Sequence, residues 1–566
     1  MTPVGASQWG GPGARLASPE AHLAASGLRP ERAIRRLREA GLWTNEGPEP
    51  GTLELIALIS NAASPEDALV VVTDLAVHHP DLFSTLHDDD PWLRRVVAVA
   101  GVSRPLGDLL ARYPDALGGL RDPRSFEPEV VASEVAAALA GRADLPTPAA
   151  AVARIRRRTT AAIAARDLTG AASVEEVALD LARLAEGVLE GSLAALQASI
   201  AGDSPAARLA VIGMGKLGGE ELNYVSDVDI MFVHEPTSAG DEAQAAREAQ
   251  QVCVALLQLL NASTTMGRAY EVDSTLRPEG RDGPLSRTLP SYVAYWQRWA
   301  ETWEFQALLK ARPVAGDHEL GARLIAAAEP FVFPERLAPE VVSEVRDMKG
   351  RVESKKEVRR EAQRQLKLGP GGIRDIEFAV QLLQLVHGRA DPSVRERSTL
   401  GALSALAHGG YVAEDDAATF VDAYRWLRSI EHRLQLAAER RTHTLPTDPE
   451  RLEELARSLG YRAVEQRPAR EPFLARLKVV QGEVRDLHAK LFYRPLLEMH
   501  ARVPATDAGI VRERFDEDAA IARLEALGFR DAAGVLRDIR AMTSGMTRRA
   551  LTVRVVLPAM LHALSE

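Results

Sequence analysis

The sequence predicts an α+β protein that is mostly helical, with one small mixed sheet among helical regions. Apolar residues recur at three- and four-residue steps along most of the chain, as they do on the buried face of a helix. Two short apolar runs near the middle, 208–213 and 228–233, are instead typical of buried strands. The 566 residues, of which 46% are hydrophobic, are enough for about three or four domains with a sizeable core.

Five regions are expected along the chain. They are a flexible Gly/Ala/Pro-rich leader (1–25), an N-terminal helical region (26–200), an α/β region (201–335), a second helical region (336–495) and a helical C-terminal region (496–566). After the two strands, the α/β region is expected to form a helix at 242–260, a third strand at 268–276 and a helix at 290–312. The charged segment 341–367 predicts a long exposed helix, and the glycine-rich break at 369–372 predicts a loop.

Composition excludes several classes of protein. Cys253 is the only cysteine, so no internal disulfide can form. No apolar run approaches the roughly 20 residues that span a bilayer, and the first residues lack the pattern of a signal peptide, so we expect a cytoplasmic protein without a membrane partner. The formal net charge of −10 argues against broad nucleic-acid binding. Only eight of the 69 basic residues are Lys, which makes each retained Lys a candidate for a required compact ammonium group.

The stretch 211–233 combines a glycine-rich loop with alternating acids and allows two interpretations. Gly213, Gly215 and Gly218 satisfy the G-x-G-x-x-G dinucleotide fingerprint after a strand. A parallel crossover needs about a dozen residues or more, whereas only nine separate Gly218 from the next strand, which disfavours this interpretation. The loop is not a Walker loop either, because Lys216 is followed by Leu and Gly instead of Ser or Thr.

The second interpretation is a metal-dependent phosphate site. Asp227 and Asp229 alternate along a strand, so both carboxylates point to one face, where a divalent cation would relieve their repulsion. Mg²⁺ prefers carboxylates, water and phosphate oxygens, and Gly218-Gly219 would let backbone N–H groups approach a phosphate closely. The alternative is a solvated turn capped by Ser226, which explains poorly the double glycine and the following apolar strand.

A third acid is expected from a neighbouring strand. Asp273 fits that role, and Glu271 is a rival because the two residues share a face at period two. A purely structural alternative is that Asp273 only pairs with Arg277.

These residues also carry a family resemblance. Gly218-Gly219, the seven residues 220–226 and Asp227-Val228-Asp229 match the signature of the polymerase-β-like nucleotidyltransferases. The longer stretch 213–229 resembles the bifunctional glutamine synthetase adenylyltransferase/adenylyl-removing enzymes. The resemblance covers roughly residues 90–560 and is carried further by 272–280, 283–285, 303–312, 367–378 and 425–436.

The resemblance implies a polymerase-β-like nucleotidyltransferase catalytic domain at 201–335, a helical bundle at 336–495 and a helical linker region at 496–566. Family members carry two nucleotidyltransferase domains, and no second G-G…S-D-x-D occurs here, so the chain resembles the N-terminal half. That half is implied to remove AMP from glutamine synthetase by phosphorolysis, with a PII-type nitrogen-signalling protein as a further partner.

The resemblance also implies a site. Asp227, Asp229 and Asp273 are expected to be catalytic and to hold two Mg²⁺ ions, with ATP, ADP and phosphate as substrates or products. The candidate nucleotide- and phosphate-binding residues are Gly218, Gly219, Ser226, Lys216, Arg277, Lys310 and Arg312. Thr275 stands where family members often have Arg, which leaves one phosphate contact open.

Ordinary roles compete with several of these assignments. Lys216 would otherwise be a solvated loop residue, and Lys310 and Arg312 are expected to end a helix, where cations favour the helix dipole. Trp296, Trp299 and Trp303 recur at helical spacing and indicate core packing rather than adenine stacking.

Three functions stay open from the sequence. The first is removal of AMP from a tyrosine of glutamine synthetase, and the second is forward transfer of AMP, or of another nucleotide. The third is a non-catalytic helical scaffold that binds glutamine synthetase or a nitrogen-signalling protein, which the intact trio of acids argues against.

Overall fold

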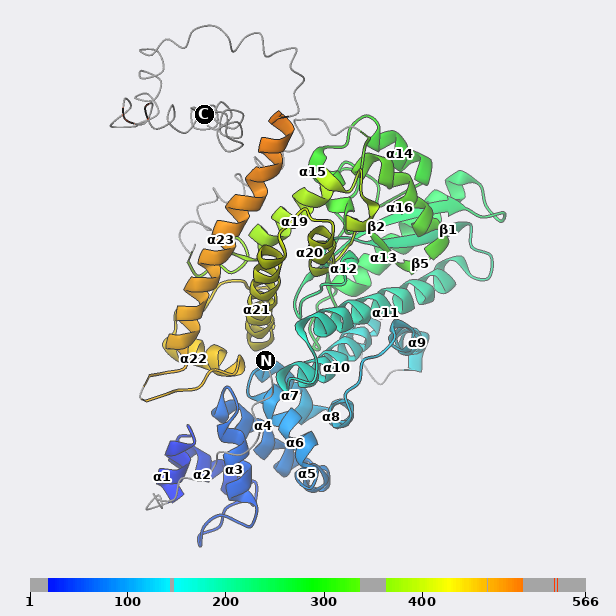
Figure 1. Cartoon of the computed structure of the whole chain (residues 1–566). Coiled ribbons are helices and arrows are strands. Elements are labelled where there is room, and N and C mark those ends of the chain that lie inside the picture. The colour runs from blue at the N-terminus through cyan, green and yellow to red at the C-terminus, as the bar shows by residue number, and fades with distance from the viewer. Residues whose placement is uncertain are drawn as a thin grey trace.

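A computed structural model describes residues 19–142, 147–335, 363–465 and 467–501, together with positions 534 and 537. The expected α+β class is confirmed, because one five-stranded sheet lies among helices that make up most of the described chain (Figure 1). The predicted long helix at 341–367 lies almost wholly outside the described residues, and so does nearly all of the C-terminal region after residue 501.

The N-terminal helices begin mostly at proline, which fits the first turn of a helix because its missing N–H would have no partner there. They are α1 (Pro19–Ala25), α2 (Pro30–Glu39), α3 (Thr52–Ser60), α4 (Pro65–His78), α5 (Pro80–His87), α6 (Asp90–Ala100), α7 (Arg104–Arg112), α8 (Pro114–Arg121), α9 (Pro128–Ala137) with the π-helical turn η1 (Ala138–Arg142), α10 (Pro148–Leu168) and α11 (Val174–Ala201). The expected flexible leader was wrong for its last residues, because Pro19–Ala25 is helical and Leu23 is fully buried. Residues 1–18 lie outside the described part.

Helices α10 and α11 form a layer between the small N-terminal helices and the sheet (Figure 1). A capping box between Ser173 and Glu176 starts α11. Gly187 and Gly191 let α9 pack tightly against α11, since a Cβ at Gly187 would lie 2.5 Å from the carbonyl oxygen of Pro128. At the sheet, Glu190 of α11 accepts the backbone N–H of Gly316 at 2.7 Å.

The sheet is mixed and has the order β3-β2-β1-β5, with β4 also paired to β2. Its strands are β1 (Ala207–Gly213), β2 (Asp227–Pro236), β3 (Glu271–Asp273), β4 (Ser286–Arg287) and β5 (Arg312–Gly316). β1 runs antiparallel to β2 and β5, whereas β3 and β4 run parallel to β2. The third strand is shorter than the predicted 268–276, because the Asp273 carboxylate accepts the N–H of Thr275 at 2.8 Å and turns the chain.

The predicted helix at 290–312 is wrong in its second half. It breaks into α14 (Leu289–Trp296) and α15 (Thr302–Leu308), and the chain then enters β5. A new capping box between Glu301 and Glu304 starts α15, and Pro313 cannot donate a helical hydrogen bond. The expected packing of three tryptophans holds for Trp296, which is buried, but Trp299 lies in the break and is 73% exposed.

Alternation along the strands gives the sheet two apolar faces. Leu209, Val211 and Phe232 belong to a core that includes α13 (Glu242–Asn261) and the N-terminal helices. Ala210 and Ile212, which alternate with them, belong to a second core with α14 and α16 (His318–Val332). The sheet is therefore held between helical layers, and the ends of its strands stay at the edge where the site lies.

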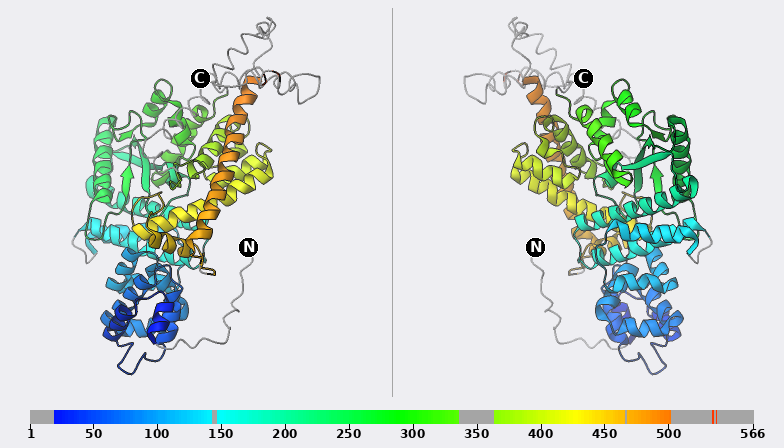
Figure 2. Two further views of the ribbon diagram at one scale, coloured as in Figure 1. Left: turned by 90° about the vertical axis from the view of Figure 1, so that its left-hand side faces the viewer. Right: turned by 90° about the vertical axis from the view of Figure 1, so that its right-hand side faces the viewer.

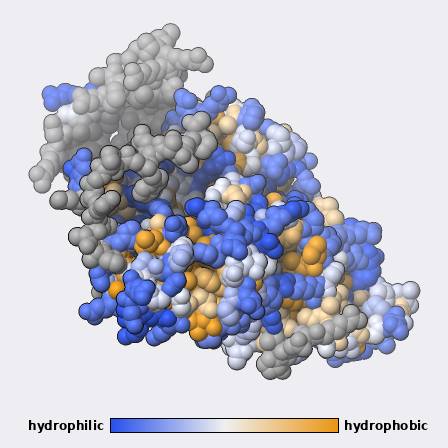
Figure 3. All heavy atoms as spheres, turned by 90° about the horizontal axis from the view of Figure 1, so that it is seen from below, coloured by the Kyte–Doolittle hydropathy of each residue, from blue (hydrophilic) through white to orange (hydrophobic). Residues whose placement is uncertain are grey.

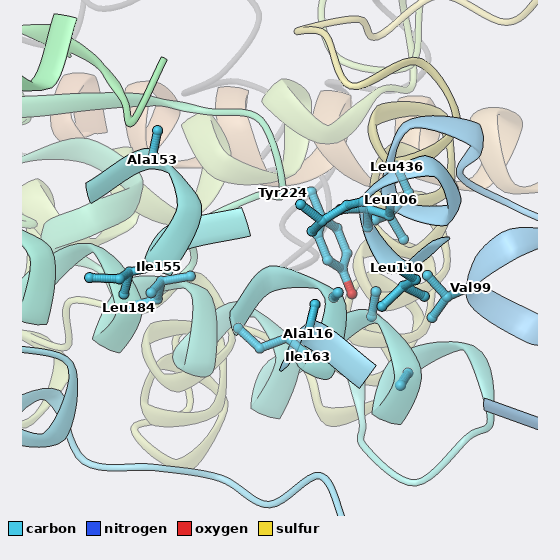
Figure 4. Packing of buried hydrophobic residues seen from close by; sticks show 14 of the residues in the cluster. Val99, Leu106, Leu110, Ala116, Ala153, Ile155, Ile163, Leu184, Tyr224 and Leu436 are labelled. Atoms are coloured by element: carbon cyan, nitrogen blue, oxygen red, sulfur yellow. The ribbon is translucent and has the colours of Figure 1, made fainter. Parts of the chain in front are cut away.

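The second helical region forms a bundle with its own core. Its elements are α19 (Ile373–His387), the 3₁₀ turn η2 (Pro392–Val394), α20 (Thr399–His408), α21 (Glu414–Ala438), α22 (Pro449–Ser458) and α23 (Arg470–Ala501). Figure 2 shows the bundle beside the sheet domain, with the small N-terminal helices at the far end. Near the end of α21, Leu436 packs with Leu106 and Tyr224 (Figure 4), which joins the bundle, the N-terminal helices and the loop before β2.

None of the described helices is both long and apolar enough to cross a bilayer. On the face in Figure 3, hydrophobic residues are interspersed among hydrophilic ones.

Candidate active site

The glycine-rich loop after β1 lies directly against the acids of β2. The N–H of Met214 donates to the carbonyl oxygen of Asp229 at 2.8 Å, and one short helical turn, α12 (Gly215–Gly218), follows. Gly215 has a φ of +51°, and a Cβ there would lie 2.7 Å from the carboxylate oxygen Oδ2 of Asp229. Only glycine therefore lets the loop approach this carboxylate so closely.

The register of the two parallel strands brings the predicted acids together. Asp229 of β2 is paired with Asp273 of β3, and Asp227 is paired with Glu271. Burial, and then the neighbouring Asp273, raise the pKa of Asp229 to about 6, against the opposing effect of Lys367. Glu271 is exposed and lies 3.9 Å from Arg268. Asp273, and not Glu271, is therefore the acid whose charge raises the pKa of Asp229.

Asp227 takes part in a different contact. Its carboxylate pairs with the guanidinium of Arg441, which lies on the loop between α21 and α22. Across the described ranges, no three or more His, Cys, Asp or Glu side chains are gathered closely enough to hold a metal ion. The donor chemistry nevertheless suits a hard cation such as Mg²⁺, because two adjacent carboxylates repel each other and raise the pKa of one of them.

A cavity of about 290 Å³ opens beside Asp229. Four cations line it together with two acids and several uncharged side chains: Lys216, Lys310, Lys367 and Arg374, with Asp229, Glu377, Gly215, Leu276, Trp303, Gln306, Ala307, Phe378 and Gln381. Three of the eight lysines of the chain therefore meet in one cavity. This arrangement suits a group with several negative charges, such as a phosphate chain, next to the carboxylates.

Lys216 is a largely buried lining residue of this cavity. Its ammonium group lies 3.6 Å from Glu377 of α19 and 3.6 Å from Glu431 of α21, and burial lowers its pKa to about 8. Burial alone would raise the pKa of Glu377, but Lys216, Lys310 and Lys367 outweigh it and lower that pKa to about 2. The bundle therefore supplies the counter-charges that hold the glycine-loop lysine in place.

The other predicted phosphate ligands mostly have structural partners. Lys310 lines the cavity but pairs with Glu221, and Arg312 pairs with Glu186 and contacts the carbonyls of Leu217 and Gly218. Neither residue ends a helix as expected, because α15 stops at Leu308 and Arg312 begins β5.

Arg277 and Ser226 lie outside the set of residues that line the cavity. The Arg277 guanidinium is buried and donates to Ser274 and to the carbonyls of Arg281 and Gly283, so it holds the turn after β3. No hydrogen bond joins it to Asp273 in the described chain. Ser226 is half-buried next to Asp227.

Gly218 and Gly219 also lie differently from the expected phosphate cradle. Their N–H groups donate to the carbonyls of Met214 and Gly215 at 3.0 and 3.1 Å, within the short helical turn. A Cβ at Gly218 would collide with the carbonyl oxygen of Lys310 and lie 2.5 Å from that of Gly213. The glycine pair lets the loop pack against the segment before β5, while Gly215 and Lys216 face the cavity.

Gly218→Ala is therefore expected to destabilise the fold by about 1–3 kcal/mol, because the new methyl group must displace backbone. Gly118→Ala is the matched control, since a Cβ at this helical glycine meets nothing within 4 Å and should be neutral or slightly stabilising. Urea denaturation of both variants measures the difference, and equal stabilities would contradict the tight packing at Gly218.

Sequence reasoning missed four residues near this site. Lys367, Arg374 and Glu377 line the cavity, although the sequence marks 367–378 only as part of the family resemblance. Nothing in the sequence pattern pointed to Arg441 as the partner of Asp227. His432 of α21 is buried, and burial lowers its pKa to about 3.

Comparison with known proteins agrees with this geometry. Residues 93–327 match the family model described as glutamate-ammonia ligase adenylyltransferase, and residues 343–492 match the model described as GlnD PII-uridylyltransferase. A bifunctional glutamine synthetase adenylyltransferase/adenylyl-removing enzyme of Streptomyces coelicolor is 45% identical over 545 residues, which cover 94% of this chain and 52% of that protein.

The chain is homologous, over most of its length, to the bifunctional glutamine synthetase adenylyltransferase/adenylyl-removing enzymes. Relatives of the same description in Streptomyces avermitilis and Mycobacterium avium are 42% and 39% identical, over 97% and 95% of this chain. The chain spans about half the length of these relatives, with 54% and 53% of them covered. This homology agrees with the nucleotidyltransferase fold that the sequence predicts.

Proposed function

We propose that this chain is a Mg²⁺-dependent nucleotidyltransferase that removes AMP from an adenylylated tyrosine of glutamine synthetase. In this reaction an oxygen of inorganic phosphate forms a bond to the α-phosphorus, the bond from that phosphorus to the tyrosine oxygen breaks, and ADP and free tyrosine result. The printed names of the relatives support glutamine synthetase as the protein acted on. The observation that carries the proposal is the pairing of Asp229 with Asp273 beside a cavity that three lysines share.

The acids and the lysines of the site are proposed to bind different groups. Asp229 and Asp273, with Asp227 as the third acid, would hold two Mg²⁺ ions, which when bound would stabilise negative charge on the phosphoryl oxygens. Lys216, Lys310 and Lys367 would attract and orient the phosphates of ADP or ATP in the adjacent cavity. Because Lys216 is fixed by two acids of the bundle, its charge is oriented before the substrate arrives.

Forward transfer of AMP from ATP is the second candidate, since the same groups would serve either direction. Removal is favoured because the chain resembles the N-terminal half of its family. The assay incubates adenylylated glutamine synthetase with the chain, Mg²⁺ and phosphate, and a parallel sample holds unmodified glutamine synthetase with ATP. ADP release supports removal, and AMP incorporation alone supports transfer. The absence of both ADP release and AMP incorporation would contradict both reactions and favour the non-catalytic scaffold.

A PII-type signalling protein is proposed as a further partner, in the cytoplasm. The match of residues 343–492 to the PII-uridylyltransferase model supports this, because that model is named for an enzyme that acts on PII. Binding of the chain to a PII-type protein in gel filtration is the expected result, and separate elution would contradict it.

Arg441→Gln is expected to tighten binding of Mg²⁺ or Mn²⁺, because it releases the Asp227 carboxylate from its present partner. The ion pair is partly exposed, so the gain is about 1 kcal/mol, or about fivefold in affinity. Arg440→Gln is the matched control, because this neighbouring arginine is exposed and the substitution removes the same charge. Calorimetric titration with Mn²⁺ measures the effect, and weaker binding by Arg441→Gln would contradict a metal role for Asp227.

A further inference from the structure

A second cavity, of about 540 Å³, lies between the N-terminal helices and the bundle. It shares no lining residue with the cavity beside Asp229. Four arginines and one acid are the charged residues that line it: Arg433, Arg457, Arg462, Arg476 and Asp167. This is a marked concentration of positive charge in a chain whose formal net charge is −10.

Three of these arginines, Arg457, Arg462 and Arg476, have no carboxylate within ion-pairing distance among the described residues. Arg457 is half-buried and donates to the carbonyl of Ser60 at 2.6 Å. Burial, and then the like charge of Arg462, lower the pKa of Arg457. Arg462 donates to the carbonyls of Arg457 and Tyr461 at 2.9 and 2.8 Å. Carbonyl oxygens satisfy some of the N–H donors but do not neutralise these charges, and Glu453 and Glu454 offset the charge of Arg457 only from beyond ion-pairing distance.

Uncharged groups of the same cavity also lack a complement. The hydroxyl of Tyr461 is buried and has no hydrogen-bond partner within the described part of the chain. The ring of Trp426 lies in the same wall, with the Arg476 guanidinium 5.0 Å from its centre.

We propose that this cavity binds a small phosphate-bearing polyanion. The oligophosphate group would lie against Arg457 and Arg462, whose planar guanidinium groups can each donate two parallel hydrogen bonds to phosphate oxygens. The volume suits a ligand of the size of a nucleotide or an inorganic oligophosphate. Trp426, whose ring contacts Phe473 and the Arg476 guanidinium, supplies an apolar part of the wall.

Two contacts connect the wall of this cavity to the loop that precedes β2. Arg433 pairs with Asp167, with 2.5 Å between Nη1 and Oδ2, and the same carboxylate oxygen accepts the hydroxyl of Tyr224 at 2.8 Å. Tyr224 precedes Asp227 by three residues and is buried in the core seen in Figure 4. The proposed site is therefore lined by the Arg433–Asp167 ion pair, and Asp167 in turn holds Tyr224 in the loop before β2.

The proposal is tested by arginine footprinting of the full chain in EDTA. Phenylglyoxal modifies exposed arginines, and peptide mass spectrometry measures the rate at each position with and without sodium tripolyphosphate. We expect tripolyphosphate to slow modification of Arg462 and Arg476 severalfold and to leave Arg35 and Arg38, which are exposed on α2, unchanged. The proposal would be overturned if Arg462 and Arg476 were not protected, or if Arg35 and Arg38 were protected to the same extent.

A variant and two further ligands sharpen the test. Arg457→Gln should remove the protection of Arg462 and Arg476, whereas Arg35→Gln, which removes the same charge from α2, should keep it. Protection that persists in Arg457→Gln would contradict the assigned site. ATP protecting at lower concentration than tripolyphosphate assigns a nucleotide as the source, equal potency assigns the oligophosphate alone, and protection by adenosine alone would overturn the role of phosphate. Should Arg457→Gln fail to fold, the wild-type footprint still decides.

Discussion

Asp229→Asn is expected to abolish nucleotidyl transfer and, at the same time, to stabilise the metal-free fold. The loss follows because the amide is a poor ligand for a hard cation and removes one of two paired carboxylates. Metal stabilisation of charge is worth several kcal/mol, so a loss of about 4 kcal/mol would lower the rate about a thousandfold. The gain in stability follows because Asn neither repels Asp273 nor has a charge to desolvate.

The stability effect has a defined pH dependence. The pKa of Asp229 is about 6 in the folded chain against an ordinary aspartate pKa of 3.8, so between these pH values the folded state binds a proton that the unfolded state has lost. The contribution of Asp229 to stability therefore falls as pH rises through this window. At pH 8 the difference between Asp229→Asn and wild type should reach about 1–3 kcal/mol, and near pH 4 it should vanish.

Urea denaturation in EDTA at both pH values measures this difference. Asp203→Asn is the control, because Asp203 is exposed and its neutralisation should change little. In the same pH window, the apparent affinity of wild type for Mg²⁺ should fall about tenfold for each pH unit below 6, as protons compete for Asp229. A stability difference that is the same at pH 4 and pH 8 would contradict the raised pKa.

Lys216→Ala is expected to destabilise the fold by about 3–5 kcal/mol, because it leaves two buried carboxylates without their shared ammonium. It should also weaken phosphate binding in the catalytic cavity, which loses one of its four cations. Lys490→Ala is the matched control, because Lys490 forms an exposed pair with Asp416 that is worth at most about 1 kcal/mol.

A double variant separates the charge effect from the lost packing of Lys216. In Lys216→Ala/Glu431→Gln the fully buried carboxylate that loses Lys216, and keeps only Arg428 and His443 as partners, is gone, so the double variant should be more stable than the sum of the two single effects. Additive effects of the two substitutions in chemical denaturation would contradict the buried network.

Local pattern was enough to predict much of the fold. The strands β1 and β2 and the helix α13 follow from apolar runs and periodicity, and the alternation of Asp227 and Asp229 places two acids on one face of β2. The register of β2 with β3 then sets Asp273 beside Asp229, a pairing that the sequence could only suggest. Elements whose identity depends on local signals were therefore predictable.

Other features depend on contacts between distant segments. The residues around Arg312 fit the end of a helix as well as the start of a strand, so the local sequence does not decide between the two. β5 forms because it can pair with the free edge of β1. Arg441, Glu377 and Glu431 reach the site from the bundle, more than a hundred residues after the acids. No spacing rule links them to Lys216 or Asp227, so only the packing of the bundle against the sheet shows their role.

Titration with Mn²⁺ followed by electron paramagnetic resonance tests the proposed metal-dependent site most directly, because it counts free Mn²⁺ without requiring a protein substrate. The wild-type chain should bind Mn²⁺ at pH 8, and binding should be lost in Asp229→Asn and retained in Asp203→Asn. Mg²⁺ should displace the bound Mn²⁺. Equal Mn²⁺ binding by wild type and Asp229→Asn would contradict the assignment of Asp229 and Asp273 as the metal-holding acids.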